Sequence, residues 1–310
     1  MSITKQEPAT RAWISAILAH FLWGLFPLYF VFLNSVGPLE VIVFRCIFSA
    51  IFCCGILILT KQVNQLLQLC KNRTIVIRLA IAGTLIIINW TAYIYAVQTD
   101  RTVDAALGYF MNPVLTVALA MIVLKERLSR FQTLAVTLGI TAVIYLLATL
   151  GTVPWISLVL AGSFGFYGLV KKRIAKQVPA VPGLVLENLA VTPILLGYWI
   201  YLFLTNQSSL QDQTVTHAAN IPVMILLLIG SGILTAIPLL LFAKAAHGLP
   251  LGILGLIQYL SPIMQMLIGV LIFHEHLPSE RWIATGIVWL ALIALSVDGI
   301  STMRKNIKQK

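Results

Sequence analysis

Long apolar runs follow one another along almost the whole chain, separated by short polar joints. A helix needs about 20 consecutive apolar residues to cross a hydrocarbon core about 30 Å thick. Runs of this length occur at ten places, which are 12–33, 38–59, 75–98, 103–124, 131–149, 155–173, 183–204, 222–245, 251–273 and 281–300. The pattern predicts an all-α polytopic membrane protein with ten transmembrane helices and no separate soluble domain.

The fourth apolar run is echoed in the ninth. At a single offset of 149 residues the equivalent pairs are Pro113 and Pro262, Glu126 and Glu275, Tyr109 and Gln258, and Asn112 and Ser261. Five runs fall in each half, so we expect one five-helix repeat over 12–149 and a second over 155–300. Because five is odd, the two repeats have opposite orientations, which is the inverted-repeat plan of secondary transporters.

Pro113 and Pro262 each stand inside an apolar run. A proline inside a helix removes one hydrogen bond and leaves the carbonyl four residues earlier, here that of Tyr109 or Gln258, without its donor. In hydrocarbon this carbonyl must be satisfied by protein or by water in a cavity. Two matched helix breaks predict a transport site around a central cavity. The alternative is a pair of ordinary kinks that let helices pack.

Composition supports a membrane protein and excludes a soluble globular or disordered one. Of the 310 residues 59% are hydrophobic and 10% are charged, and the mean hydropathy is +0.95. The net charge of +11 would suggest nucleic acid in a soluble protein, but here we expect no such partner. The four cysteines lie in or just after the second run and contain no CxxC pair, so we expect neither a disulfide framework nor a metal site.

The positions of Lys and Arg predict the orientation. If the N-terminus is cytoplasmic, all but three of the 21 Lys and Arg residues fall in cytoplasmic joints, tails or helix ends. The exceptions are Arg45 inside the second run and Arg101 and Arg281 on the other side. The positive-inside rule then predicts that both termini lie in the cytoplasm.

Several short motifs resemble a known family. They are Leu107-Gly-Tyr-Phe-Met-Asn-Pro113 with Lys125-Glu-Arg127, Asn89-Trp90, Phe166-Tyr-Gly-Leu-Val-Lys-Lys172 and Gln258-Tyr-Leu-Ser-Pro262. The chain resembles the RarD group of EamA-type proteins in the drug/metabolite transporter superfamily over nearly its whole length. The resemblance implies ten transmembrane helices in two inverted halves. It also implies export of small metabolites or drugs across a bacterial inner membrane.

Two charged residues stand inside apolar runs, where a charge costs about 2.5–3.5 kcal/mol and must be sheltered, paired or functional. Arg45 lies about 10 Å below the outer face and can hold a substrate carboxylate, or can extend toward the lipid headgroups. Glu187 lies about 8 Å from the cytoplasmic face and can bind an amine or carry a proton, or can pair with Lys172 or Lys176. Their depths differ by about 12 Å, so we expect no direct salt bridge between them.

Other candidates form an aromatic and hydrogen-bonding wall suited to amphipathic solutes. Asn89, Trp90 and Tyr93 lie in the third run and Trp23 in the first. The two proline segments add Tyr109, Asn112, Gln258 and Tyr259. A membrane-buried amide such as Asn89 needs a partner on another helix, whereas each aromatic residue can equally be a packing or lipid-facing residue.

Histidines and the remaining acids offer further chemistry. His20, near the middle of the first run, can titrate between pH 5 and 8, or can be a buried neutral histidine bonded to a neighbouring helix. Glu126 and Glu275 stand at the ends of the fourth and ninth runs, where ion pairs or helix caps are expected. Alternating histidines such as His274 and His276 point apart on a helix, so we expect no metal there.

These features favour a secondary active transporter that exports small metabolites or drug-like solutes by alternating access, with proton coupling through Glu187 or His20 as a candidate. The alternatives are an amino-acid or amine permease of the same fold, a membrane-embedded enzyme and a passive channel. The sequence contains no HExxH, GxSxG or phosphate-loop motif. We expect no cofactor, a solute such as an amino acid, amine, lysolipid or drug, contact with membrane lipid, and a monomer or homodimer.

Overall fold

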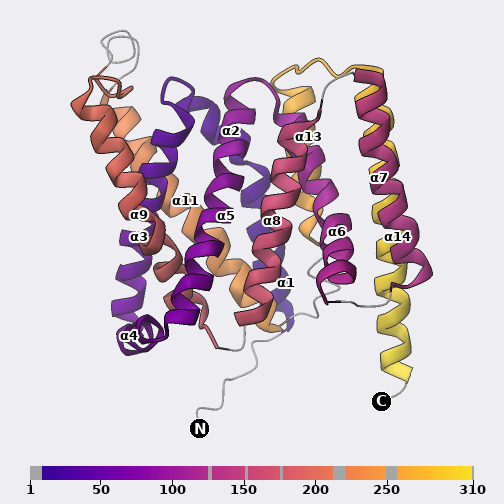
Figure 1. The fold of residues 1–310 in the computed structure, drawn as a ribbon, viewed down its shortest axis with the longest axis horizontal. Helices are drawn as coiled ribbons and strands as arrows, with labels where there is room; N and C mark the ends of the chain where they lie inside the picture. The colour runs from indigo at the N-terminus through magenta and orange to yellow at the C-terminus, as the bar shows by residue number, and fades with distance from the viewer. Residues whose placement is uncertain are drawn as a thin grey trace.

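The apolar runs form helices whose ends lie close to the polar joints (Figure 1). The computed structural model describes residues 9–124, 128–150, 153–174, 177–211, 221–248 and 257–308. All regular elements of these residues are helical. In chain order they are α1 (Ala9–Gly24), α2 (Phe26–Phe30), the 3₁₀ helix η1 (Val31–Leu33), α3 (Pro38–Leu59), α4 (Val63–Lys71), α5 (Arg73–Gln98), α6 (Thr102–Leu124), α7 (Arg130–Leu150), α8 (Trp155–Ile174), α9 (Ala180–Leu204), α11 (Ile221–Gly248), α13 (Leu260–Leu271) and α14 (Ser279–Lys308).

Many of these helices have the length and composition of membrane spans. Within the described residues, α3, α5, α7, α9, α11 and α14 each contain a segment long and apolar enough to cross a bilayer, and the bent pair α1 and α2–η1 makes a seventh candidate. The predicted run 38–59 coincides with α3. The prediction of an all-helical polytopic membrane protein is therefore confirmed.

Two local features were not predicted. The first apolar run bends by 41° between α1 and α2, because Pro27 stands in the first turn of α2 and cannot donate a backbone hydrogen bond. The joint after α3 contains the short helix α4, whose Leu69 is buried in a cluster with Leu79 and Ile174. A nine-residue helix with one apolar face is too short to register as a membrane span.

The two prolines of the repeated segment lie differently in their helices. Pro113 lies inside α6, which continues on both sides of it. Pro262 lies in the first turn of α13, whose N-cap is Tyr259. A proline in a first turn costs no helical hydrogen bond, because its missing N–H would have no partner there. The residues 249–256 before this start lie outside the described part of the chain.

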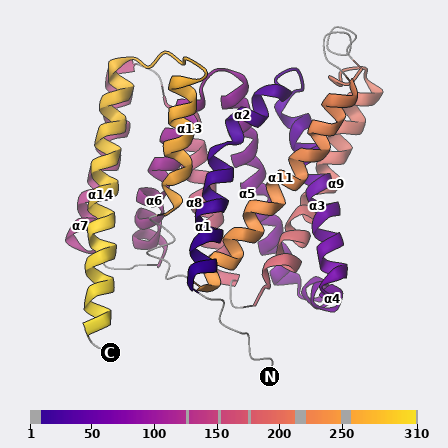
Figure 2. The same cartoon turned by 180° about the vertical axis from the view of Figure 1, so that it is seen from behind.

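The helices of the two halves interleave. Figures 1 and 2 show α7 beside α14 at one side of the bundle and α3 beside α9 at the other. The most extensive helix contacts join one half of the chain to the other, namely α6 with α8, α7 with α14, α5 with α8, α1 with α11, and α3 with both α11 and α9. The described chain begins with α1 and ends with α14 at the end of the bundle that carries α4.

Two glycines allow close helix crossings. A Cβ on Gly83 of α5 would lie 2.8 Å from the carbonyl oxygen of Glu187 on α9. A Cβ on Gly232 of α11 would lie 2.5 Å from the carbonyl carbon of Phe48 on α3. Small residues let membrane helices approach closely. Gly232 follows Gly83 by the same 149 residues that separate Pro113 from Pro262.

Candidate functional site

Arg45 lies in the interior of the bundle, with 2% of its surface exposed. Its guanidinium carbon lies 4.1 Å from the ring centroid of Trp90, 5.2 Å from that of Phe30 and 5.4 Å from that of Phe26. Its Nε donates to Thr235 Oγ1 on α11 at 2.5 Å. The side chain is therefore enclosed by aromatic faces, which attract a cation, and does not extend to the headgroups.

Asn89 and Tyr109 are hydrogen-bonded to each other beside Arg45. Asn89 Nδ2 donates to the carbonyl of Leu160 at 2.9 Å and to Ser163 Oγ at 3.0 Å, both on α8. Its Oδ1 accepts from the Tyr109 hydroxyl at 3.0 Å. The expected interhelical partners of this buried amide are present, and they join α5 to α6 and α8.

Tyr93 connects the Asn89–Tyr109 pair to the surroundings of Arg45. Its ring centroid lies 5.9 Å from that of Tyr109 and 6.2 Å from that of Phe30. Five predicted site residues from α3, α5 and α6 thus meet in one place. We call them the central cluster, which consists of Arg45, Asn89, Trp90, Tyr93 and Tyr109.

His20 and Trp23 belong to a second group. Ser261 Oγ donates to the carbonyl of His20 at 2.8 Å and lies 3.1 Å from His20 Nδ1. Since the hydroxyl has one proton, the ring must donate at Nδ1 if both contacts are hydrogen bonds. Gln265 Nε2 donates to the carbonyl of Trp23 at 3.0 Å, and the His20 and Trp23 rings lie 5.0 Å apart. We call His20, Trp23, Ser261 and Gln265 the second cluster.

Glu187 is buried, with 1% of its surface exposed. Its carboxylate forms an ion pair with Lys171 on α8 and accepts from the Tyr167 hydroxyl at 3.3 Å. The predicted partners were Lys172 or Lys176. The side chain of Lys172 and the whole of Lys176 lie outside the described part of the chain, so neither prediction is tested. Glu187 and Arg45 are not paired with each other, since Arg45 has no described carboxylate within ion-pair distance.

The remaining predicted residues lie near these groups in the chain. Asn112 is buried in α6, while Gln258 and Tyr259 are half-buried just before α13. Pro113 is half-buried and Pro262 is buried. Glu126 lies outside the described residues. Within the described part of the chain, no three His, Cys, Asp or Glu residues are placed to hold a metal ion.

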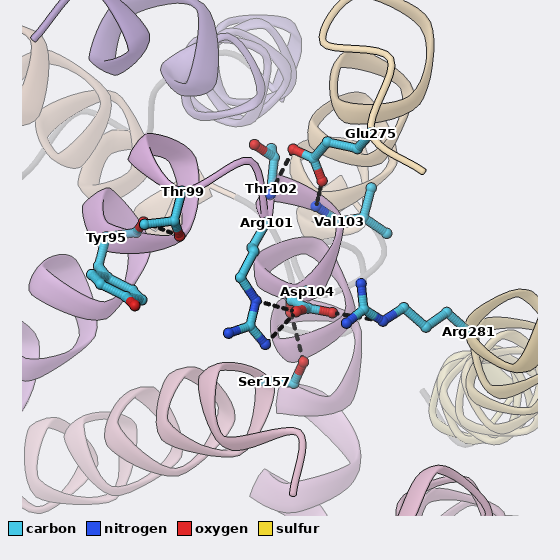
Figure 3. Close-up of polar contacts among 9 residues, drawn as sticks. All are labelled: Tyr95, Thr99, Arg101, Thr102, Val103, Asp104, Ser157, Glu275 and Arg281. Atoms are coloured by element: carbon cyan, nitrogen blue, oxygen red, sulfur yellow. Dashed lines mark hydrogen bonds and ion pairs between the residues drawn. The ribbon is translucent and has the colours of Figure 1, made fainter. Parts of the chain in front are cut away.

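Glu275 caps a helix, but not the one that follows it. Its two carboxylate oxygens accept from the backbone N–H groups of Thr102 at 2.7 Å and Val103 at 2.9 Å, at the start of α6 (Figure 3). A carboxylate there satisfies unpaired N–H groups and faces the positive end of the helix dipole. Glu275 therefore joins the loop after α13 to the other half of the chain.

An ion-pair network that the sequence did not reveal lies beside this cap. Asp104 accepts from Arg101 at 2.8 Å and pairs with Arg281 of α14 at 3.3 Å (Figure 3). The Ser157 hydroxyl of α8 donates to the Asp104 carbonyl at 2.7 Å. We call Arg101, Asp104, Glu275 and Arg281 the end network. The spacing of Arg101 and Asp104 was its only sequence signal, and it gave no information about Arg281.

Comparison with known proteins identifies the family. The EamA-like transporter family matches residues 10–148 and again residues 153–297. A transporter of Pseudomonas aeruginosa is 39% identical over 295 residues, covering 95% of this chain and 96% of its own. The protein RarD of Streptomyces exfoliatus is 38% identical, and the match covers 93% of this chain and 89% of the relative. The protein RarD of Escherichia coli is 37% identical, and the match covers 94% of this chain and 96% of the relative.

A solved structure supports the fold. It has a TM-score of 0.61 at 16% sequence identity and covers 94% of this chain and 99% of its own. Together with the two family matches and the RarD relatives, this likeness agrees with the resemblance found in the motifs. The chain belongs to the EamA-like transporter family of the drug/metabolite transporter superfamily and is a multi-pass membrane transporter of the RarD type.

Proposed function

We propose that this transporter is a secondary active exporter of small metabolites or amphipathic drug-like solutes in the bacterial inner membrane. It works by alternating access between two inverted five-helix repeats, residues 12–149 and 155–300. Ten helices cross the membrane, and both termini lie in the cytoplasm. The distribution of Lys and Arg supports this orientation, since α4, the start of α5 and the end of α8 lie at one end of the bundle and carry Lys71, Arg73, Arg78, Lys171 and Arg173.

The observation that carries the proposal is that the contacts between halves keep their pattern when the halves are exchanged. In chain order, the helices α1, α3, α5, α6 and α7 of the first half correspond to α8, α9, α11, α13 and α14 of the second. When each helix is replaced by its counterpart, the contact α5–α8 becomes α11–α1 and the contact α3–α11 becomes α9–α5. In the same way, the contact α6–α8 becomes α13–α1. All of these contacts are present. The pairs α3–α9, α6–α13 and α7–α14 map onto themselves and are also present.

The close crossings agree with the same exchange. Gly83 approaches α9, and its counterpart Gly232 approaches α3. A structure in which each half can take the other's place can adopt two equivalent arrangements, one open to each side of the membrane, which is the basis of alternating access in inverted-repeat transporters. The separate family matches to 10–148 and 153–297 support the same two units.

The solute site in this proposal lies between the two polar clusters. The central cluster is formed by residues of α3, α5 and α6, and the second cluster by residues of α1 and α13. When the two halves are exchanged, α1 corresponds to α8 and α13 corresponds to α6. Residues at the centre of a bundle that carry hydrogen-bonding groups on aromatic walls suit amphipathic solutes. The proposed solute-binding residues are Trp23, Arg45, Asn89, Trp90, Tyr93, Tyr109, Asn112, Glu187, Gln258 and Tyr259.

Glu187 and His20 are the proposed proton-coupling groups. Glu187 is a buried carboxyl whose partner Lys171 lies in the last turn of α8 and has a third of its side chain exposed. In this proposal, water reaches the pair from that end of the helix. The Nε2 of His20 is buried and has no hydrogen-bond partner among the described residues. Intramembrane acids and histidines are the usual proton carriers in transporters.

Transport by purified protein in liposomes tests the proposal. A secondary transporter gives saturable flux that competing solutes inhibit and that an imposed gradient drives, whereas a channel gives flux proportional to concentration. If protons are coupled, a pH gradient changes the initial rate, and Glu187→Gln abolishes this dependence while the folded protein is retained. Flux without saturation in the wild type would refute the carrier mechanism.

A further inference from the structure

The charge of Arg45 has no described counter-ion. Five of the seven described acids have other partners. Asp104 pairs with Arg101 and Arg281, Glu187 pairs with Lys171, Glu275 caps α6, Glu40 accepts from Ser208 and Ser209, and Asp298 accepts from Ser129 and Gln132. The other two, Asp100 and Glu280, are not within ion-pair distance of Arg45. A buried charge is stable only if it is paired or well solvated by fixed dipoles. Within the described residues, the guanidinium of Arg45 instead contacts one hydroxyl group, that of Thr235, and aromatic faces such as that of Trp90.

Two strong donors near each other are also unused. Arg45 Nη1 and the Tyr93 hydroxyl are both buried and have no hydrogen-bond partner within the described part of the chain. The ring centroid of Phe30 lies 5.2 Å from the guanidinium carbon of Arg45 and 6.2 Å from the ring centroid of Tyr93, so the two donors belong to side chains that pack around one ring. Buried polar groups are almost always paired, so an unused guanidinium N–H beside an unused phenol indicates a missing acceptor.

We propose that the transported solute supplies this acceptor as a carboxylate carried on an apolar or aromatic body, and that this carboxylate binds to Arg45 Nη1 and the Tyr93 hydroxyl. This inference rests on the proposed function and narrows its solute class to small organic acids. A carboxylate has two oxygens for two separate donors and a single negative charge for a single cation.

The same geometry disfavours a cationic solute at this place. Aromatic faces can bind an ammonium group, but here Phe26, Phe30 and Trp90 already face the guanidinium of Arg45. A second cation would meet like charge with no described carboxylate to compensate. The site therefore separates acids from amines by charge.

Matched compounds test the inference directly. The purified full-length protein in detergent is heated with 3-phenylpropionate, 3-phenylpropanamide or 3-phenylpropylamine, which share one apolar body and differ in the head group. A ligand that binds the folded state raises the apparent melting temperature according to its affinity. We expect the acid to raise it in a saturable way, and the amide and amine to leave it unchanged.

Variants assign the effect to the two donors. Tyr93→Phe keeps the ring and should weaken acid binding about fivefold, as expected for the loss of one hydrogen bond. Arg45→Lys keeps the charge but not the planar donor set, and should weaken it about tenfold or more. Arg73→Gln, which removes an exposed arginine at the start of α5, should bind the acid as the wild type does.

Each other outcome counts against the inference. Equal stabilisation by the amide or the amine would show that the carboxylate is not recognised. If Tyr93→Phe and Arg45→Lys bound the acid with the same affinity as the wild type, the site would lie elsewhere. If the acid at millimolar concentration did not stabilise the wild type, the proposed solute class would be overturned. In that last case saturable flux of another solute in liposomes would leave the transporter proposal intact.

Discussion

Asn89 is bonded to three groups on two neighbouring helices. Interhelical hydrogen bonds inside membranes contribute about 0.6 kcal/mol each on average. Asn89→Ala should therefore lower the free energy of unfolding by about 1–2 kcal/mol. Tyr109→Phe, which removes only the bond to Asn89 Oδ1, should cost about 0.6 kcal/mol. Denaturant titration of the purified protein in mixed micelles measures both.

A threonine on the same helix provides the control. Thr84 bonds only to the carbonyl of Ala80 within α5 and is exposed, so Thr84→Ala should change stability by less than about 0.5 kcal/mol. If Asn89→Ala were no more destabilising than Thr84→Ala, the bonds to α8 would contribute little, and the position of Asn89 would have to be explained by solute binding alone.

The sequence identified site residues best where a polar side chain stands within an apolar run. Arg45, Asn89 and Glu187 could be found in this way, because a polar group in hydrocarbon requires a partner. Their partners could not be found, since Thr235 and Ser163 lie far from them in sequence and hydroxyl groups are common in membrane helices. The contact of Trp23 with His20 could not be found either, because the direction of a side chain depends on how its helix is rotated.

The glycine crossings predict a matched pair of stability effects. Gly83→Ala places a Cβ 2.8 Å from the carbonyl oxygen of Glu187, and Gly232→Ala places one 2.5 Å from the Phe48 carbonyl carbon. Backbone atoms cannot move aside singly, so each helix pair must separate. Each substitution should cost about 1–3 kcal/mol, as overpacking does, and thermal unfolding in detergent would show it.

Gly286 of α14 is the matched control, because a Cβ there would meet no atom within 4 Å. Gly286→Ala should be neutral or stabilise the protein by up to about 1 kcal/mol, since alanine is the better helix former. If Gly83→Ala and Gly286→Ala had the same effect, α5 and α9 would not be in close contact at Gly83. If only one of Gly83 and Gly232 were sensitive, the two crossings would not be equivalent.

The end network should act as a closed gate on the side opposite the termini. Glu275→Ala removes the cap of α6 and should cost about 1 kcal/mol of local stability, which is about a fivefold change in an opening equilibrium. Leu107 is buried and lines a small hollow with Arg101, Asp104 and Arg281. A cysteine placed by Leu107→Cys should therefore react about fivefold faster with a membrane-impermeant maleimide added from that side when Glu275 is replaced.

Glu280→Ala is the control for this reaction. It removes an acid from the first turn of α14, at the same end of the bundle, without touching the cap of α6. The labelling rate of the cysteine at position 107 should then match that of the Leu107→Cys parent. Equal acceleration by both substitutions would indicate a general effect of charge, and no acceleration by Glu275→Ala would mean that the end network does not hold this side closed.

At the scale of helices the sequence predicted most of the fold. Hydrophobic run length located α3 to the residue and most other helices to within a few residues, because the bilayer thickness sets their length. It missed α4, whose stability depends on the burial of Leu69 against α8 and α9, and the bend before α2. Which helices touch depends on side-chain packing between distant segments, and only the equivalence of Pro113 and Pro262 gave information about it.

The orientation of the whole molecule follows from charge and can be tested at one native cysteine. Of the four cysteines, Cys46 and Cys53 are buried, Cys54 is partly exposed and Cys70 is exposed. Cys70 lies on α4 at the end of the bundle that carries both termini. If cations face the cytoplasm, a membrane-impermeant maleimide should label the protein in sealed inverted vesicles but not in intact cells.

The variant Cys70→Ser should remove the signal, which assigns the labelling to α4. Labelling of Cys70 in intact cells would place α4 and both termini outside and would reverse the assignment of the end network, which would then close the cytoplasmic side. Because the two halves have exchangeable contacts, the helices alone are compatible with either orientation. The excess of cations at the α4 end favours one of the two orientations, so replacing Lys61, Lys71, Arg73 and Arg78 by glutamine should make the orientation mixed in the same labelling assay.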